Sequence, residues 1–267
     1  MRTKERPMPD YSAIDQTAAL RYIFYPRRDF TQCPEKAFDL PVPVEDDVSV
    51  LCRFYTGGQQ WPWILFFHGN GEVVSDYDEI APFYNKKGLN IVVADYRGYG
   101  MSSGVPTLTA LVRDAHVLFK AVTDELAKRG FRPYLWVMGR SLGSISALEL
   151  ASKHQDAIRG LIIESGFTSV VRIIKHLGIP VHDIPLEEID HECVERVKGI
   201  RLPTLIIHGE WDTLVPAKEA EDLYRNLGSE HKELVVIPSA DHNDVLFVGF
   251  ETYFGALQTF TKVTDKD

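Results

Sequence analysis

The sequence predicts an α/β fold built on a mostly parallel, doubly wound sheet. Short apolar runs rich in β-branched residues recur along the chain, as expected of strands that are covered on both faces. Segments with helical spacing of apolar residues separate most of these runs, and such alternation produces parallel strands joined by right-handed crossovers. The expected strands are residues 48–55, 63–67, 89–94, 134–138, 158–163, 204–208 and 234–237.

The expected helices lie between these strands. They are residues 77–87, 108–129, 142–154, 217–227 and 244–262, and the last carries a broad apolar stripe. Residues 21–55 lack helical periodicity, so we expect them to add antiparallel strands at one edge of the sheet. Because the chain shows no repeat, low-complexity tract or interdomain linker, residues 1–267 are expected to form a single domain.

One long connection, residues 166–202, separates two core strands. It carries two helical candidates, 169–177 and 188–197, and predicts either a plain helical crossover or a short lid over the site. A short lid favours an open, shallow cleft over a deep, closed lipid pocket. Apolar residues at its start either line an acyl pocket or form the core-facing side of a helix, which is the interpretation we favour for most of them. They are Phe167, Val170, Val171, Ile173, Ile174, Leu177 and Ile179.

Composition excludes several classes of function. With 267 residues, 45% of them hydrophobic, the chain has material for a substantial core, and its net charge of −9 disfavours a nucleic-acid partner. The three cysteines, Cys33, Cys52 and Cys193, are widely spaced and form neither a disulfide framework nor a metal pair, which indicates a reduced, cytoplasmic setting. The N-terminal residues lack an apolar core and no run is long enough to span a bilayer, so we expect no signal peptide and no stable membrane insertion. No phosphate-binding glycine motif is present, and we expect no cofactor.

Two segments fit the pattern G-x-S-x-G, in which a serine occupies a sharp turn between a strand and a helix. Gly139-Arg140-Ser141-Leu142-Gly143 directly follows an expected strand, and helical spacing continues after it. Gly100-Met101-Ser102-Ser103-Gly104 lies well beyond its strand, and the nearby Pro106 disfavours a helix there. This context predicts Ser141 as a nucleophile and Ser102 as a loop residue. For Arg140 we expect either an ion pair with Glu164 or, more simply, a solvent-facing side chain.

A serine hydroxyl needs a base to remove its proton and an acid to orient that base. His242 and Asp212 each lie in a loop after a predicted strand, at the edge of the sheet where reactive groups gather. Each also has an ordinary interpretation. For His242 it is a solvated or helix-capping side chain, and for Asp212 it is a carboxylate that stabilises a turn or caps a helix. Glu210 and Asp241 are rival acids, although Asp241 is adjacent to His242 and poorly placed to reach its ring. The order serine, acid, histidine after successive strands favours Ser141, Asp212 and His242 together.

With these residues in place, the chain resembles the α/β-hydrolases of the serine hydrolase type, in particular the small-lid branch of bacterial esterases and depalmitoylase-like proteins. The resemblance covers residues 63–267. It rests on His68-Gly69-Asn70-Gly71-Glu72, on residues 95–104 and 163–169, on the Ser141 turn and on the Asp212 and His242 loops. It implies an α/β-hydrolase fold with an oxyanion hole. The expected donors are the backbone N–H groups of Leu142, directly after the nucleophile, and of Asn70, which matches the family's His-Gly-x motif.

The same resemblance implies a serine hydrolase that cleaves carboxylic esters or thioesters of a small-molecule acyl substrate through an acyl-enzyme. A peptidase, a C–C hydrolase or an acyltransferase with the same triad is an alternative, because fold and triad do not choose among these reactions. A noncatalytic ligand-binding protein on this scaffold is another. His68 and His208 lie beside glycines at strand ends and are interpreted as packing residues, since no ligand spacing completes a metal site.

Overall fold

The computed structural model describes residues 9–132 and 135–264. Within these residues, eight strands form one sheet in the order β1-β2-β4-β3-β5-β6-β7-β8. The pairs β1–β2 and β2–β4 are antiparallel and all others are parallel, which confirms the predicted fold class and the antiparallel edge. The strands are β1 Ala37–Glu45, β2 Val48–Tyr55, β3 Trp63–Phe67, β4 Asn90–Ala94, β5 Leu135–Arg140, β6 Gly160–Glu164, β7 Thr204–Gly209 and β8 Lys232–Ile237. Tyr134, the expected first residue of β5, lies outside the described residues.

The helices agree with expectation except near the two ends of the chain and after β3. They are α1 Ser12–Asp15, α2 Leu20–Ile23, α3 Ala81–Lys86, α4 Leu108–Lys128, α5 Ser144–Lys153, α6 Val170–His176, α7 Leu186–Lys198, α8 Ala217–Asn226, α9 Val245–Val248 and α10 Phe250–Thr264, with 3-10 turns η1 Val74–Tyr77 and η2 Ser141–Gly143. The helix expected at 77–87 is shorter in the structure. It begins at Ala81, and Pro82 lies in its first turn, where proline is well tolerated. The expected final helix is broken at Gly249, where an added Cβ would lie 2.5 Å from the Ile237 side chain.

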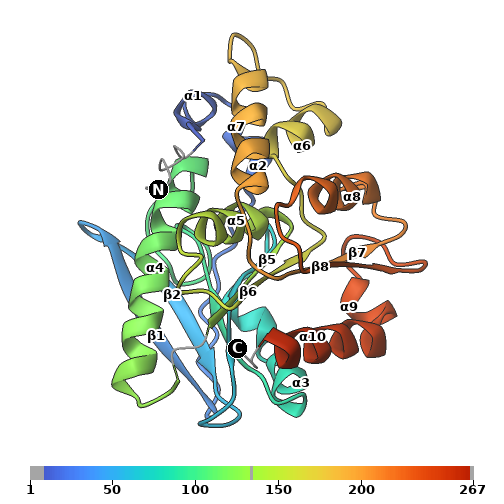
Figure 1. Cartoon of the computed structure of the whole chain (residues 1–267). Helices are drawn as coiled ribbons and strands as arrows, with labels where there is room; N and C mark the ends of the chain where they lie inside the picture. The colour runs from blue at the N-terminus through green and yellow to red at the C-terminus, as the bar shows by residue number, and fades with distance from the viewer. Residues whose placement is uncertain (1–8, 133–134, 265–267) are drawn as a thin grey trace.

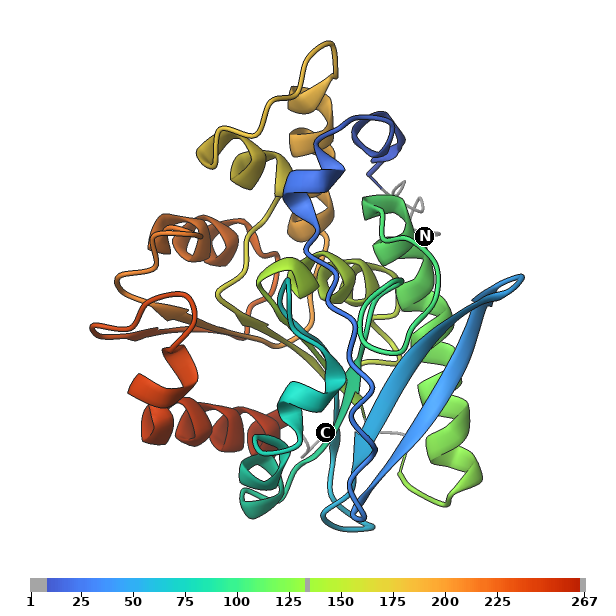
Figure 2. The ribbon, with the colours of Figure 1, turned by 180° about the vertical axis from the view of Figure 1, so that it is seen from behind.

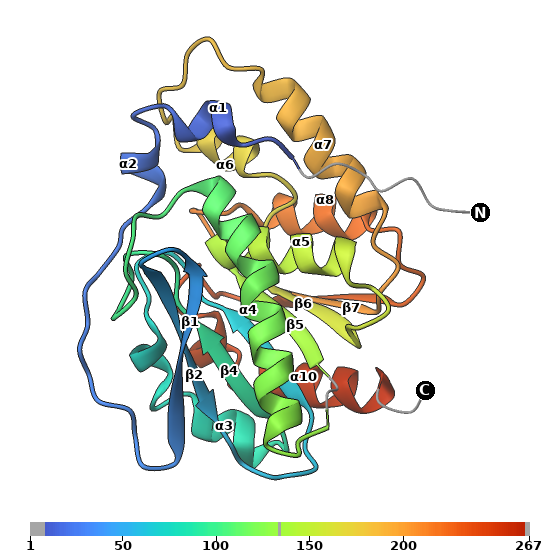
Figure 3. The same cartoon turned by 90° about the vertical axis from the view of Figure 1, so that its left-hand side faces the viewer.

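Two apolar cores cover the two faces of the sheet. In β3, Leu65 and Phe67 belong to the core that includes α4 and α5, whereas Ile64 and Phe66 belong to the core that includes α3 and α10. This alternation follows from the two-residue period of a strand. Figures 1 and 3 show α4 and α5 on one face of the sheet and α3 and α10 on the other. The doubly wound arrangement leaves the ends of the parallel strands accessible for a site.

Two segments far apart in sequence lie at the same end of the molecule. The connection from β6 to β7 carries α6 and α7, which pack on each other and lie at the top of Figure 1. Figure 2 shows the blue N-terminal segment leaving this region and running down across the molecule. Within the part of the chain that the structure describes, no helix has the length and apolar character needed to cross a bilayer. A lid role for residues 166–202 stays a prediction.

Candidate active site

Ser141 stands on the sharp turn that the sequence predicts. The strand β5 ends at Arg140, and Ser141 follows with a φ of 50°, a left-handed conformation that is strained for a residue with a side chain. The two glycines of the motif allow this turn. A Cβ on Gly139 would lie 2.4 Å from the carbonyl oxygen of Gly143, and a Cβ on Gly143 would lie 2.0 Å from that of Phe67. The close approach of strand and helix therefore requires glycine at both positions.

The structure brings Ser141, His242 and Asp212 into one chain of hydrogen bonds. Nε2 of His242 lies 2.9 Å from Oγ of Ser141, and Nδ1 of His242 lies 2.7 Å from Oδ2 of Asp212. All three side chains are buried. Since an ionised carboxylate only accepts hydrogen bonds, Nδ1 carries the proton and Nε2 is free to accept the proton of the serine. This is the arrangement that activates a serine nucleophile.

Asp212 combines the two roles that its sequence position suggested. Oδ1 accepts hydrogen bonds from the backbone N–H groups of Leu214 at 3.0 Å and Val215 at 2.7 Å, which is the turn role. Oδ2 faces His242 and also lies 3.3 Å from Nε2 of His208. Burial alone would raise the pKa of Asp212, but the hydrogen bonds from His208 and His242 lower it to about 2. The carboxylate is therefore ionised and fixed in orientation throughout the neutral range.

The rival residues point elsewhere. Oε2 of Glu210 accepts a hydrogen bond from the backbone N–H of Ser239 at 3.0 Å. Oδ1 of Asp241 accepts one from the backbone N–H of His242 at 2.6 Å, not from the imidazole ring. Ser102 lies in a loop, where its Oγ accepts a hydrogen bond from the backbone N–H of Leu51 at 2.9 Å. The second G-x-S-x-G segment thus has a structural use.

Arg140, inside the motif, is a buried side chain that contacts two loops of the site. The expected pair with Glu164 is present, with Nε donating to Oε1 at 3.1 Å, and it follows from the register of the parallel strands β5 and β6. The expectation that Arg140 faces solvent is wrong, because its side chain is only 10% exposed. Nη1 pairs with Glu72, and Nη2 donates to the carbonyl oxygen of His242 at 2.9 Å and to Oδ1 of Asn243 at 3.1 Å. One guanidinium therefore joins the loop after β3 to the loop that carries His242.

The pKa values of the two carboxylates around Arg140 shift in opposite directions. Burial would raise the pKa of Glu72, but the charges of Arg140 and His68 lower it below its usual range. For Glu164, burial dominates and the pKa is raised despite the arginine. Oε2 of Glu164 accepts a hydrogen bond from the hydroxyl of Tyr253 at 2.7 Å. Buried ionic groups of this kind are tolerated only when every member has its partners.

A cavity opens above Ser141. Its volume of about 490 Å³ is within the usual range for small-molecule sites. Asn70 and Leu142, the two expected oxyanion donors, also line it. Most of the seven apolar residues at the start of the 166–202 connection belong to the core or pack against it, which confirms the interpretation that we favour. Six of the seven also line the cavity. They are Phe167, Val170, Ile173, Ile174, Leu177 and Ile179. Val170, Ile173 and Ile174 of α6 supply part of this wall. The expectation of an open, shallow cleft stays a prediction.

The sequence carries no comparable signal for the remaining wall of the cavity. Tyr22, Ile23 and Tyr25, from the N-terminal part of the chain, line it from the other side. Tyr22 and Ile23 lie in α2 and Tyr25 follows it. Since α1 and α2 have four residues each, they are too short to show a periodic pattern. No local sequence pattern predicts the contacts of Arg140 with Glu72 and with the His242 loop, since they join residues that are far apart along the chain.

His68 and His208 both lie in hydrogen-bonded, buried positions. His68 contacts Oδ1 of Asp95 at 3.1 Å and the carbonyl oxygen of Gly69 at 2.8 Å. His208 is more than a packing residue, because its Nε2 lies near Oδ2 of Asp212 as well as 2.8 Å from the carbonyl oxygen of Val215. Among residues 9–132 and 135–264, no group of three or more histidine, cysteine or acidic side chains is arranged to hold a metal ion.

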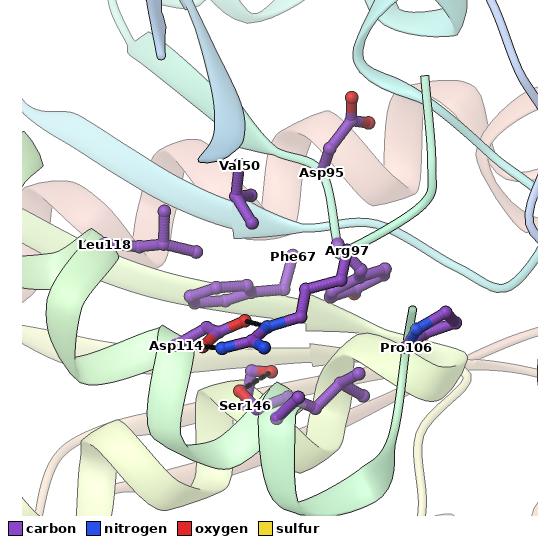
Figure 4. Close-up of a pocket in the computed structure, with 11 residues that line it drawn as sticks. Val50, Phe67, Asp95, Arg97, Pro106, Asp114, Leu118 and Ser146 are labelled. Carbon is purple, nitrogen blue, oxygen red and sulfur yellow. Dashed lines mark hydrogen bonds and ion pairs between the residues drawn. The ribbon is translucent and has the colours of Figure 1, made fainter. Parts of the chain in front are cut away.

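A second hollow, beside α4, is too small to be a substrate site. Its volume is about 10 Å³, room for a single water at most. Figure 4 shows Arg97 reaching across it to Asp114. Two parallel hydrogen bonds of 2.7 and 2.8 Å join them. Ser146, which lies beside this pair, donates to the carbonyl oxygen of Leu111 at 3.1 Å. The hydroxyl of this serine therefore has a structural partner.

Comparison with known proteins identifies relatives of this chain. The family model described as "Serine aminopeptidase, S33" matches residues 60–180 and 186–246. Protein bem46 of Schizosaccharomyces pombe is 30% identical over 208 residues, which cover 76% of this chain and 68% of that protein. An uncharacterized protein of Mycobacterium tuberculosis is 29% identical over 230 residues, or 85% of this chain and 79% of its own length.

Solved structures of esterases share the fold. The esterase Pf2001 of Pyrococcus furiosus has a TM-score of 0.73 at 20% identity, covering 89% of this chain and 98% of its own. Est1E of Butyrivibrio proteoclasticus, in a structure with bound ferulic acid, has a TM-score of 0.68 at 19% identity, covering 85% of this chain and 100% of its own. The family match spans more than half of the sequence. The chain therefore belongs to the serine aminopeptidase S33 family of the α/β-hydrolase superfamily.

Proposed function

We propose that this protein is a serine hydrolase that cleaves carboxylic esters or thioesters through an acyl-enzyme. The observation that carries the proposal is the hydrogen-bonded chain Ser141–His242–Asp212 at the floor of a largely apolar cavity. We assign Ser141 as nucleophile, His242 as general base and then general acid, and Asp212 as the group that orients His242.

The proposed reaction has two halves. Oγ of Ser141 attacks the substrate carbonyl while Nε2 of His242 takes its proton, and His242 then returns that proton to the leaving alcohol or thiol. Water attacks the acyl-enzyme by the same route and releases the acid. The backbone N–H groups of Leu142 and Asn70 are proposed to stabilise the negatively charged oxygen of each tetrahedral intermediate, each donor contributing about 3 kcal/mol.

The lining of the cavity supports an apolar acyl group as the substrate. Its wall on the α6 side consists of Ile173, Ile174, Leu177 and neighbouring apolar side chains. Each buried methylene of an acyl chain contributes roughly 0.8 kcal/mol to binding. Est1E, whose fold this chain shares, holds a carboxylic acid in its solved structure. Ester and thioester substrates, including acyl thioesters of the depalmitoylase-like kind, fall within this proposal, as does the cytoplasmic setting.

A fluorophosphonate probe tests the nucleophile directly. We expect the probe to add to the wild-type protein at Ser141 and the wild type to hydrolyse nitrophenyl esters. Ser141→Ala should lose both properties, whereas Ser102→Ala, the matched change in the other G-x-S-x-G segment, should keep both. Labelling of Ser141→Ala to the same extent as the wild type would refute the assignment.

An aminopeptidase is the second candidate, because it is the activity in the description of the matched family. An aminopeptidase must bind the positively charged amino terminus of its substrate. Among the described residues, those that line the cavity include no carboxylate, and Arg140 is one of them. This charge pattern favours a neutral acyl group. Faster turnover of aminoacyl anilides than of nitrophenyl esters would reverse the preference.

A further inference from the structure

The side chain of Asn70 is held by the N-terminal segment, defined here as residues 11–30. Nδ2 of Asn70 donates to the carbonyl oxygen of Ile23 at 2.7 Å, and Oδ1 accepts the backbone N–H of Tyr25 at 3.0 Å. The hydroxyl of Tyr99 donates to the same Oδ1 at 2.6 Å and also accepts the N–H of Tyr25 at 3.1 Å. The carboxamide is thus fixed from both of its ends by partners outside its own loop.

The N-terminal segment contacts the loop around Asn70 at a second point as well. This loop is short and turns sharply, with Gly71 at a φ of 78°. The second contact lies directly after Asn70, where Nε of Arg27 donates to the carbonyl oxygen of Gly71 at 3.2 Å. An oxyanion donor is useful only when its N–H points at the developing charge before the reaction begins.

The N-terminal segment is itself anchored to the body of the protein. The carboxylate of Asp15 accepts the backbone N–H groups of Leu108 at 2.8 Å and Thr109 at 3.0 Å, at the start of α4. The hydroxyl of Tyr11 lies 3.3 Å from Sγ of Cys193 on α7, and Ile14 is fully buried. A segment tied down at this many points is able to hold a loop in place.

We infer that the N-terminal segment positions the oxyanion hole through the side chain of Asn70. Asn70 then has two separate parts, a backbone N–H proposed to touch the oxyanion and a carboxamide that holds that N–H in place. This goes beyond the family match, which begins at residue 60 and does not include the segment. The inference rests on the proposed function, because it concerns the stabilisation of a tetrahedral intermediate.

Asn70→Ala tests the inference, because alanine keeps the backbone N–H and removes only the carboxamide contacts. We expect kcat for a short nitrophenyl ester to fall on the order of tenfold to a hundredfold, with KM changed less than about twofold, since a misplaced donor weakens the transition state alone. A kcat equal to that of the wild type, or a higher KM with unchanged kcat, would overturn the inference. Loss of ester turnover or probe labelling in the wild type would instead reject the proposed function.

Tyr99→Phe provides an independent arm, which also applies if Asn70→Ala does not fold. It removes one hydroxyl from Asn70 and should lower kcat about threefold to tenfold. In the Asn70→Ala background the same change should have no further effect on kcat, because its route through Asn70 is already gone. Additive effects would contradict the inference. The control is Tyr55→Phe, which removes a buried hydroxyl bonded to Val74 and Asp78 from a residue that does not line the cavity.

Discussion

Nη2 of Arg140 donates a hydrogen bond of 2.9 Å to the backbone carbonyl oxygen of His242. The residue next to the proposed nucleophile therefore helps to fix the loop that carries the proposed base. The same guanidinium pairs with Glu164 and Glu72, and Oε2 of Glu72 accepts the backbone N–H of Gly69 at 2.7 Å. The loop after β3, the loop that carries His242 and the end of β6 thus all contact one side chain.

The first prediction concerns the ion pairs of Arg140. Arg140→Met should lower the free energy of unfolding by about 3–5 kcal/mol, because it removes the guanidinium that pairs with Glu72 and with the buried Glu164. Adding Glu164→Gln should recover part of that loss, since a neutral amide at this buried position needs no counterion. Urea denaturation of the three proteins measures both effects. A double variant less stable than Arg140→Met would contradict this view of the pair.

The second prediction is that Asp212→Asn inactivates the site without unfolding it. The two backbone N–H groups at Oδ1 will hold the amide oxygen of Asn there, so the NH2 group will face Nδ1 of His242. The imidazole must then accept at Nδ1 and carry its proton on Nε2, where it cannot take the proton of Ser141. In a triad, this change of tautomer lowers kcat by roughly 10³–10⁴.

Steady-state ester hydrolysis and a thermal melt measure this second prediction together. Glu210→Gln is the matched control, because its new amide oxygen can still accept the Ser239 N–H and it does not touch the histidine. If Glu210→Gln lost activity while Asp212→Asn kept it, the acid would have been misassigned.

Local sequence signals predicted the parts of the site that depend on local structure. The glycines around Ser141 mark a turn that no other residue permits, and Asp212 and His242 each follow a strand whose apolar pattern is visible. Parallel strands bring these loop positions to one edge of the sheet. The triad geometry therefore follows from the order of elements and needs no long-range contact to be predicted.

The remaining parts depend on contacts between distant segments. Whether Arg140 faces water or a buried carboxylate is decided by the register of β5 on β6 and by the position of Glu72, neither of which has a local pattern. The N-terminal segment reaches Asn70 through main-chain atoms of Ile23 and Tyr25. Main-chain hydrogen bonds leave no mark on the amino-acid sequence, so this wall of the cavity could not be predicted.

The third prediction concerns the acyl pocket. Ile173 lines the cavity and is only partly buried, so Ile173→Trp should fill part of the space without disrupting a core position. In the wild type, kcat/KM should rise about fourfold for each methylene added to the acyl chain while the chain still enters the pocket. In Ile173→Trp this rise should stop at a shorter chain.

A series of nitrophenyl esters from acetate upward measures this length limit. Val117→Trp is the control, because it adds the same side chain at an exposed position on α4 that does not line the cavity. An unchanged limit in Ile173→Trp would show that the acyl chain does not lie along α6.

The fourth prediction links stability to pH through His154, at the end of α5. Burial and the neighbouring His116, whose Nδ1 lies 2.8 Å from Nε2 of His154, lower the pKa of His154 from its usual value of 6.5. The unfolded chain therefore takes up this proton at a higher pH than the folded protein does. His154 contributes stability that is present above pH 6.5 and is lost as the pH falls through its lowered folded pKa.

His154→Gln should thus lose less unfolding free energy than the wild type between pH 7.5 and pH 5, as measured by urea denaturation across that range. His182→Gln, at an exposed position between α6 and α7, should keep the wild-type slope, and parallel curves for all three proteins would contradict the assignment.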